Sequence, residues 1–125
     1  MDKVAVIILL VSNIEISVAF YVKLGFIVTE ERLGIATILK LDDFWIELLD
    51  KTRVVSEEYK KDVAVSEKGA GAYLQIQVKD IDNFHATIVN NGVLSAGKPE
   101  DYPWNQREFV VVDPNGYKIA FFSRI

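Results

Sequence analysis

Few residues in this chain of 125 amino acids can act as acids, bases or nucleophiles. There is no cysteine and one histidine, His85, which excludes thiolate chemistry, disulfides and an all-histidine metal site within one subunit. One carboxylate, Glu47, and one amine, Lys118, lie in stretches that are otherwise largely apolar. Buried charges are normally paired. Glu47 is therefore a general base in a dry pocket, a structural hydrogen-bonding residue, or a carboxylate that Lys118 partly neutralises.

Two similar halves of the chain must position these residues. Each half predicts a strand, a helix and three further strands. In the first half these are residues 4–11, 12–25, 26–31, 35–41 and 44–49, and in the second 73–78, 80–92, 93–96, 107–113 and 118–124. Ser12 together with Glu15 is typical of a capping box at the start of the first helix, and Asp80 is a candidate N-cap of the second. Gly25 and Gly92 are typical of residues that end a helix.

The two halves also match in register, because fourteen residues separate Val11 from Gly25 and Val78 from Gly92. An internal repeat of this size predicts an α+β fold of two tandem βαβββ modules, 1–50 and 70–125, in a single domain. The modules would form a curved mixed sheet with a cleft. Residues 51–69 carry nine charges of both signs among nineteen residues. We interpret this segment as a solvated linker with a short amphipathic helix through Val55, Tyr59 and Val63, and a functional lid is the alternative.

Alternation of side chains along strands predicts which of them face the cleft. In the strand at 73–78 the apolar positions must pack on a helix, so Tyr73 and Gln75 face the other way. The same rule places Trp45 beside Glu47, although Trp45 as plain core is the alternative. The repeat extends the cleft face to Lys118 and Phe122. We therefore expect a cleft that is aromatic and amide-rich, with one carboxylate and one amine.

Composition limits the partners. The net charge of −4 argues against nucleic acid, which requires a basic stripe. No run approaches the roughly 18 apolar residues of a membrane span. The apolar run at 4–11 suits a buried strand better than a secretion signal, because Asp2 offsets Lys3 and Glu15 follows the run. A cytoplasmic location is expected.

Two motifs resemble a known superfamily. Residues 11–21 (Val-Ser-Asn-Ile-Glu-Ile-Ser-Val-Ala-Phe-Tyr), ending in Leu24-Gly25-Phe26, resemble the opening of vicinal oxygen chelate proteins. These include glyoxalase I, extradiol dioxygenases, fosfomycin-modifying enzymes and bleomycin resistance proteins. Residues 102–109 (Tyr-Pro-Trp-Asn-Gln-Arg-Glu-Phe), followed by residues 113–121 (Asp-Pro-Asn-Gly-Tyr-Lys-Ile-Ala-Phe), resemble the bleomycin-resistance branch. The resemblance covers nearly the whole chain except residues 51–69.

The resemblance implies positions for a metal. Enzymes of the superfamily bind a divalent metal through His and Glu, or related oxygen ligands, on equivalent strands of the repeat. Here these positions hold Val6, Glu47, Tyr73 and Ala120. Of these four, only Glu47 can ligate a metal directly. Tyr73 would have to ionise, which is disfavoured without a metal already present. Catalytic sites use about three protein ligands. We therefore predict no metal and no cofactor.

In the bleomycin-resistance branch the protein acts by sequestration without a metal. Two chains pair so that modules from different subunits enclose clefts for a planar, cationic drug. The family's tryptophan of the Pro-Trp-Gly motif stacks on the ligand and corresponds to Trp104 here. Asn105 stands where the family has glycine, which puts the ligand's identity in doubt. Tyr102 is a candidate at the border of the cleft.

The leading hypothesis is a metal-free homodimer that sequesters a small aromatic cation. There are two alternative hypotheses. The first is an enzyme, a lyase or isomerase, that uses Glu47 as a general base or has an incomplete metal site. The second is a non-binding dimer with a regulatory or structural role. We expect His85 at the edge of the core, and structural salt bridges for Arg107 and Glu108. The predicted ligand-binding residues are Trp45, Glu47, Tyr73, Gln75, Tyr102, Trp104, Lys118 and Phe122.

Overall fold

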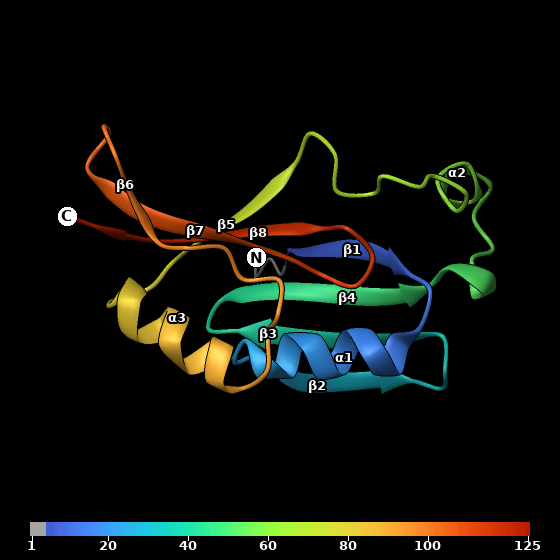
Figure 1. The fold of residues 1–125 in the computed structure, drawn as a ribbon. Helices are drawn as coiled ribbons and strands as arrows, with labels where there is room; N and C mark the ends of the chain where they lie inside the picture. The colour runs from blue at the N-terminus through green and yellow to red at the C-terminus, as the bar shows by residue number, and fades with distance from the viewer. Residues whose placement is uncertain (1–4) are drawn as a thin grey trace, which may run out of the picture. The chain divides into compact units, whose positions relative to one another are not determined.

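A computed structural model describes residues 5–125, which form two compact units divided after Ser66 (Figure 1). Each unit contains one four-stranded mixed sheet with one long helix. The first unit consists of β1 (Val6–Val11), α1 (Ile14–Lys23), β2 (Ile27–Arg32), β3 (Ala36–Leu41), β4 (Phe44–Asp50), the 3₁₀ turn η1 (Lys51–Arg53) and α2 (Glu57–Lys60). The second consists of β5 (Tyr73–Gln77), α3 (Ile81–Asn90), β6 (Glu100–Tyr102), β7 (Gln106–Val112) and β8 (Lys118–Arg124).

The two sheets have the same topology. Their strand orders are β1-β4-β3-β2 and β5-β8-β7-β6. In each sheet the first strand pairs in parallel with the last, and the other pairs are antiparallel. The predicted α+β class and tandem βαβββ order are confirmed, and the strands form two sheets of four rather than one continuous sheet.

Both long helices begin at a capping side chain. Asp80 caps α3 as predicted, because its Oδ1 accepts a hydrogen bond of 3.1 Å from the backbone N–H of Asn83. The predicted cap of α1 is wrong by one residue. Asn13, with an extended backbone, accepts a hydrogen bond of 3.0 Å from the N–H of Ile16, so Ser12 lies outside the helix.

Aromatic contacts fix which face of each sheet the helix covers. In the first unit Tyr21 of α1 packs against Phe26, with ring centroids 5.3 Å apart, and Phe26 packs against Phe44 of β4 at 6.2 Å. The helix side of this sheet therefore carries Phe44 and, by alternation, the fully buried Ile46 and Leu48.

In the second unit the helix side is likewise aromatic. Phe84 of α3 lies 4.6 Å from Phe121 of β8 and 6.3 Å from Phe109 of β7, between ring centroids. Phe121 is completely buried. Lys118 and Phe122, which differ from Phe121 in strand parity, consequently face away from α3, as the sequence predicts.

The predicted strand at residues 93–96 is wrong. This segment runs alongside β7 but forms only isolated hydrogen bonds with it. The Ser95 hydroxyl donates to the carbonyl of Val112, and the N–H of Gly97 donates to the carbonyl of Val110. A Cβ at Gly97 would lie 3.2 Å from the Val110 carbonyl oxygen, and Pro99 has no N–H to donate. Regular pairing therefore begins only at Glu100.

The segment after β4 is more than a solvated linker. Val54 and Val63 pack against the buried cluster of Leu10, Ala36 and Leu49. The predicted apolar positions were Val55, Tyr59 and Val63, but Val55 is 87% exposed and the helix is only the single turn α2. The solvated interpretation is thus wrong for two valines, which cover part of the sheet face opposite α1.

The far end of this segment is also held closely. A Cβ at Gly69 would lie 1.9 Å from the carbonyl oxygen of Gly116, so only glycine fits there. Among residues 5–125, no helix is long and apolar enough to span a membrane.

Candidate functional site

The candidate residues lie on the face of each sheet opposite its helix, which we call the open face. In the first unit, pairing of Glu47 with Ile8 and Ile38, and of Trp45 with Lys40, defines this face. In the second unit it carries five of the eight predicted residues, which are Tyr73, Gln75, Tyr102, Lys118 and Phe122. Trp104 lies in the hairpin between β6 and β7 and stacks on Tyr102.

Glu47 has a partner within its own unit. Its side chain is 12% exposed, and its Oε1 accepts a hydrogen bond of 3.3 Å from Nη1 of Arg32. Arg32 in turn pairs through Nε with Oε2 of Glu30 at 2.6 Å. The hydrogen bond to Glu30, followed by the charges of Glu30 and Glu47, raises the pKa of Arg32. Glu47 is therefore one end of a carboxylate–guanidinium–carboxylate chain.

Sequence alternation missed Arg32 because β2 contains a bulge. The register shifts between Val28 and Glu30, so one extra residue is accommodated there. Counted without the bulge, Arg32 would share the face of Val28. With it, Glu30 pairs with Ile38 and Arg32 with Ala36, which places both on the open face beside Glu47.

Trp45 is half-buried on the open face, and the ammonium of Lys40 lies 5.4 Å from its ring centroid. A similar contact occurs in the second unit, where the ammonium of Lys118 lies 5.1 Å from the ring of Tyr73. Tyr73 is 58% exposed, and Gln75 beside it is exposed as well. Lys118 thus has an aromatic neighbour, a contact of roughly 0.5–1 kcal/mol at exposed sites.

The hairpin between β6 and β7 presents a stacked aromatic pair. The rings of Tyr102 and Trp104 lie 5.0 Å apart and 17° from parallel, and Trp104 is 58% exposed. Stacking on Tyr102 holds the indole, while the exposure of Trp104 leaves ring surface available. A planar molecule can extend this stack without having to order a free side chain first.

Asn105 maintains the hairpin in the conformation that glycine favours. Its φ is +61°, in the left-handed region where asparagine is the residue best tolerated after glycine. Its N–H donates to the carbonyl of Tyr102 at 3.2 Å, and its carbonyl accepts from the N–H of Ile125 at 3.0 Å. The replacement of glycine by asparagine therefore requires no other backbone conformation here.

Arg107 and Glu108 point to opposite faces of β7. The salt bridges predicted for Arg107 are confirmed, with Asp82 at 3.1 Å and Asp101 at 3.0 Å. The prediction for Glu108 is wrong, because its Oε2 is buried and has no hydrogen-bond partner. Glu108 pairs with Phe122 across the β7–β8 ladder and so lies on the open face.

Tyr102 and Phe122 border this carboxylate. Tyr102 pairs with Gln106, two residues before Glu108 on the same face. Desolvation, followed by the charges of Glu100 and Glu108, raises the pKa of the Tyr102 hydroxyl. Phe122 is 7% exposed, and the guanidinium carbon of Arg124 lies 5.9 Å from its ring centroid.

The four positions equivalent to metal ligands do not assemble a ligand set. Val6 pairs with Trp45, Ile8 lies beside Glu47, and Gln75 lies beside Ala120. Within the described part of the chain, no three His, Cys, Asp or Glu side chains gather closely enough to hold a metal ion.

His85 has a structural role, as expected for the core edge. Its Nε2 donates to the carbonyl oxygen of Gly97 at 2.8 Å, which assigns the tautomer. Its ring packs edge-on against Phe109 at 4.8 Å. The imidazole thereby anchors the loop before β6.

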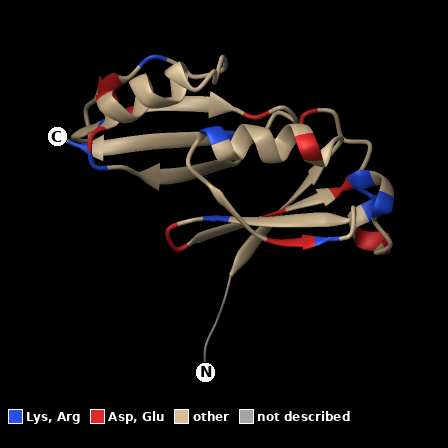
Figure 2. Cartoon of the chain, turned by 90° about the horizontal axis from the view of Figure 1, so that it is seen from below, with Lys and Arg blue, Asp and Glu red and all other residues tan. Residues whose placement is uncertain are grey.

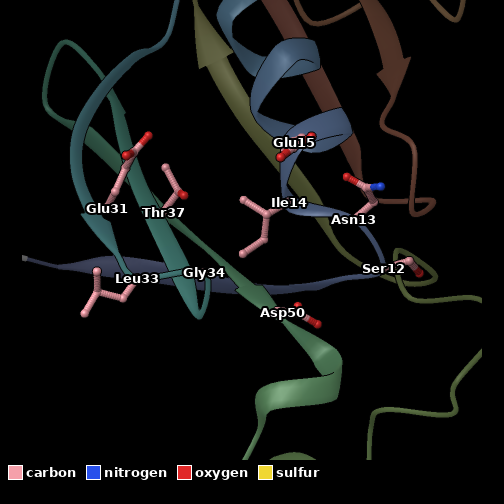
Figure 3. Close-up of a pocket in the computed structure, with 9 residues that line it drawn as sticks. All are labelled: Ser12, Asn13, Ile14, Glu15, Glu31, Leu33, Gly34, Thr37 and Asp50. Atoms are coloured by element: carbon pink, nitrogen blue, oxygen red, sulfur yellow. The ribbon is translucent and has the colours of Figure 1, made fainter.

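An open pocket of about 610 Å³ lies at the start of α1 (Figure 3). Two of its polar side chains are helix caps, since Asn13 caps α1 and Asp50 accepts a hydrogen bond of 2.9 Å from the N–H of Thr52. Hydrogen bonds from Thr52 lower the pKa of Asp50. None of the eight predicted residues lines this pocket, whose residues are Ser12, Asn13, Ile14, Glu15, Glu31, Leu33, Gly34, Thr37 and Asp50.

The charged side chains are dispersed along both units. Figure 2 shows acidic residues at the N-terminal ends of both long helices, where Glu15 and Asp82 complement the helix dipoles. In α2 and just after it, Lys60 and Lys61 pair with Glu57 and Glu58 three residues earlier.

Paired βαβββ units with mixed sheets and open faces define a class of small two-module proteins. The chain belongs to the Glyoxalase/Bleomycin resistance protein/Dioxygenase superfamily, whose family model matches residues 3–121. It is 30% identical over 123 residues to the bleomycin resistance protein of Geobacillus stearothermophilus, with 92% of each chain covered.

Solved structures show the same fold. A glyoxalase/bleomycin resistance protein/dioxygenase from Nocardioides has a TM-score of 0.77 and 22% identity, over 100% of this chain and 85% of that one. TnmS3, an antibiotic binding protein from Streptomyces sp. CB03234, has a TM-score of 0.74 and 20% identity, over 100% and 98% of the two chains.

Proposed function

We propose that this protein binds and sequesters a small planar aromatic molecule without a metal. The observation that carries the proposal is the stacked Tyr102–Trp104 pair, in which Trp104 is 58% exposed on the hairpin between β6 and β7. The similarity to a curated bleomycin resistance protein supports the same function. An exposed aromatic pair that is already ordered favours binding by further stacking.

The contacts of Glu47 favour binding over catalysis. A general base needs a carboxylate that is free to accept the substrate's proton. Here Arg32 already donates to Glu47, and the other positions equivalent to metal ligands hold Val6, Tyr73 and Ala120. A lyase or isomerase built on Glu47 therefore has less support than a binding protein.

Titration with bleomycin and a planar dye such as 9-aminoacridine tests this proposal. We expect saturable binding with a change in tryptophan fluorescence, because the chain has only two tryptophans, Trp45 on the open face of the first unit and Trp104 stacked on Tyr102 in the second. The compounds should be recovered unchanged by mass spectrometry after long incubation. Binding weaker than millimolar for every planar compound would contradict sequestration, and a stoichiometric conversion would favour the enzyme.

We further propose that the protein is a homodimer. The outer strands β1 and β5 expose apolar and aromatic side chains, with Val6 40%, Ile7 38% and Tyr73 58% exposed. Sheet edges of this kind are normally covered by another chain or element. A second copy of the chain is the simplest partner, and it would complete each open face.

Light scattering at micromolar concentration should therefore give twice the chain mass of 14.1 kDa. A Tyr73→Lys substitution should shift the equilibrium toward monomer, because it adds charge to an edge strand. The exposed Leu94→Lys substitution, in the loop before β6, serves as the matched control and should leave the mass unchanged. A wild-type mass of one chain would refute the dimer.

A cytoplasmic location is part of this proposal. A chain without cysteine needs no oxidising compartment for its folding.

A further inference from the structure

We propose that Glu108 is the residue that makes the stacking site selective for cationic ligands. The inference depends on the proposed function, since it assigns a specificity-determining residue at the same stacking surface. Glu47 is the carboxylate that the sequence predicts in the cleft, and Glu108 is a second carboxylate on an open face. The two carboxylates differ in their partners, and that difference decides between them.

Glu108 lies close to the stacked pair on the same face of the second unit. Tyr102 pairs with Gln106 on β7, and alternation puts Glu108 on the side of Gln106. The charge of Glu108 also contributes to the raised pKa of Tyr102, which requires the two side chains to be near each other. A ligand stacked on the hairpin would thus lie within reach of the carboxylate.

The carboxylate of Glu108 has no compensating charge. Its Oε2 is buried without a hydrogen-bond partner, and no basic side chain of residues 5–125 forms an ion pair with it within 4.0 Å. A partly desolvated carboxylate without a donor is unfavourable. A ligand cation beside this side chain would supply the missing opposite charge.

The basic residues on neighbouring strands are engaged elsewhere. Arg107 points to the helix side, where it holds Asp82 and Asp101. On β8, Lys118 lies over the ring of Tyr73, and Arg124 lies over that of Phe122. None of them neutralises Glu108, whereas Arg32 neutralises Glu47 in the first unit.

Tyr102 adds no negative charge of its own. Desolvation and the two nearby carboxylates raise the pKa of its hydroxyl, so it remains protonated and points to Glu100 at 3.4 Å. The aromatic pair therefore adds no negative charge, and the side chains of Glu100 and Glu108 lie beside it on the same face. This combination fits a ligand whose ring is flat and whose substituent is an amine or guanidine.

A matched pair of dyes tests the assignment. At pH 8, 9-aminoacridine is a cation and acridine is neutral, and the two rings have nearly the same shape. We expect wild type to prefer the cation, and Glu108→Gln to lose about tenfold in affinity for the cation but little for acridine. Glu67→Gln, which removes an exposed charge of the same unit, is the control for net charge.

The outcomes separate the two proposals. Equal affinity of wild type for both dyes, or loss of the preference in Glu47→Gln but not in Glu108→Gln, would overturn the role of Glu108 and leave sequestration standing. Failure of both dyes and bleomycin to bind would overturn the proposed function and this inference together. If Glu108→Gln does not fold, Glu108→Leu provides the same comparison, because it also removes the charge.

Discussion

The Phe121→Ala variant is expected to lose about 3–5 kcal/mol of unfolding free energy. Phe121 is fully buried and lies between Phe84 of α3 and Phe109 of β7, with centroid distances of 4.6 and 5.7 Å. Among the residues that the structure describes, Phe121 is the only one whose ring contacts both Phe84 and Phe109. Its truncation removes this contact and leaves a cavity under the helix. Domains have only about 5–15 kcal/mol of stability, so this loss is large.

Urea denaturation followed by far-UV circular dichroism measures this change. Ile119→Val, two residues earlier on the same side of β8, deletes one buried methylene and should cost about 0.5–1.5 kcal/mol. A loss below about 1 kcal/mol in Phe121→Ala would show that α3 does not depend on this packing. The result also sets the scale against which binding variants on the open face are judged.

Most of the fold follows from local signals that tertiary packing does not override. Gly25 and Gly92 end their helices with φ of +106° and +96°, as their residue type and matching spacing predict. In the turn before β8, Asp113 Oδ1 accepts from the N–H groups of Asn115 and Tyr117, and Gly116 has a φ of +95°. These residues determine their turns by themselves.

The errors arise where backbone pairing depends on residues far away in sequence. The strand at 93–96 failed because the close approach of Gly97 to Val110 cannot be inferred from apolar composition. Val93 is nevertheless buried, with 3% exposure. The apolar residues of this segment therefore indicated burial in the core and not hydrogen-bonded pairing with another strand. Composition alone does not separate these two causes of burial.

The charged residues of the site were the hardest to place. The bulge in β2 directs Arg32 toward Glu47, and no sequence pattern marks a bulge between Val28 and Glu30. The sequence predicts salt bridges for both Arg107 and Glu108. Alternation separates them, and only the register of β7 against β8 shows that Glu108 faces Phe122. The placement of Glu108 on the open face therefore required the structure.

Trp104→Ala is expected to weaken binding of planar ligands by about tenfold. Loss of an aromatic stack costs roughly 0.5–1.5 kcal/mol beyond the buried area, and 1.4 kcal/mol corresponds to a factor of ten. Because Trp104 is 58% exposed, the free energy of unfolding should change by less than about 1 kcal/mol. Isothermal titration with 9-aminoacridine and urea denaturation measure the two effects separately.

Asn105→Gly is the matched control for this variant. Glycine adopts the φ of +61° at least as readily as asparagine, so the hairpin and ligand affinity should persist. A β-branched residue is strained in this conformation, and Asn105→Val should therefore weaken binding by displacing Trp104 although the indole is still present. If Trp104→Ala binds as tightly as wild type, or if Asn105→Val leaves affinity unchanged, the ligand does not stack on this hairpin. Binding would then depend on the other tryptophan, Trp45, which lies beside Lys40 on the open face of the first unit.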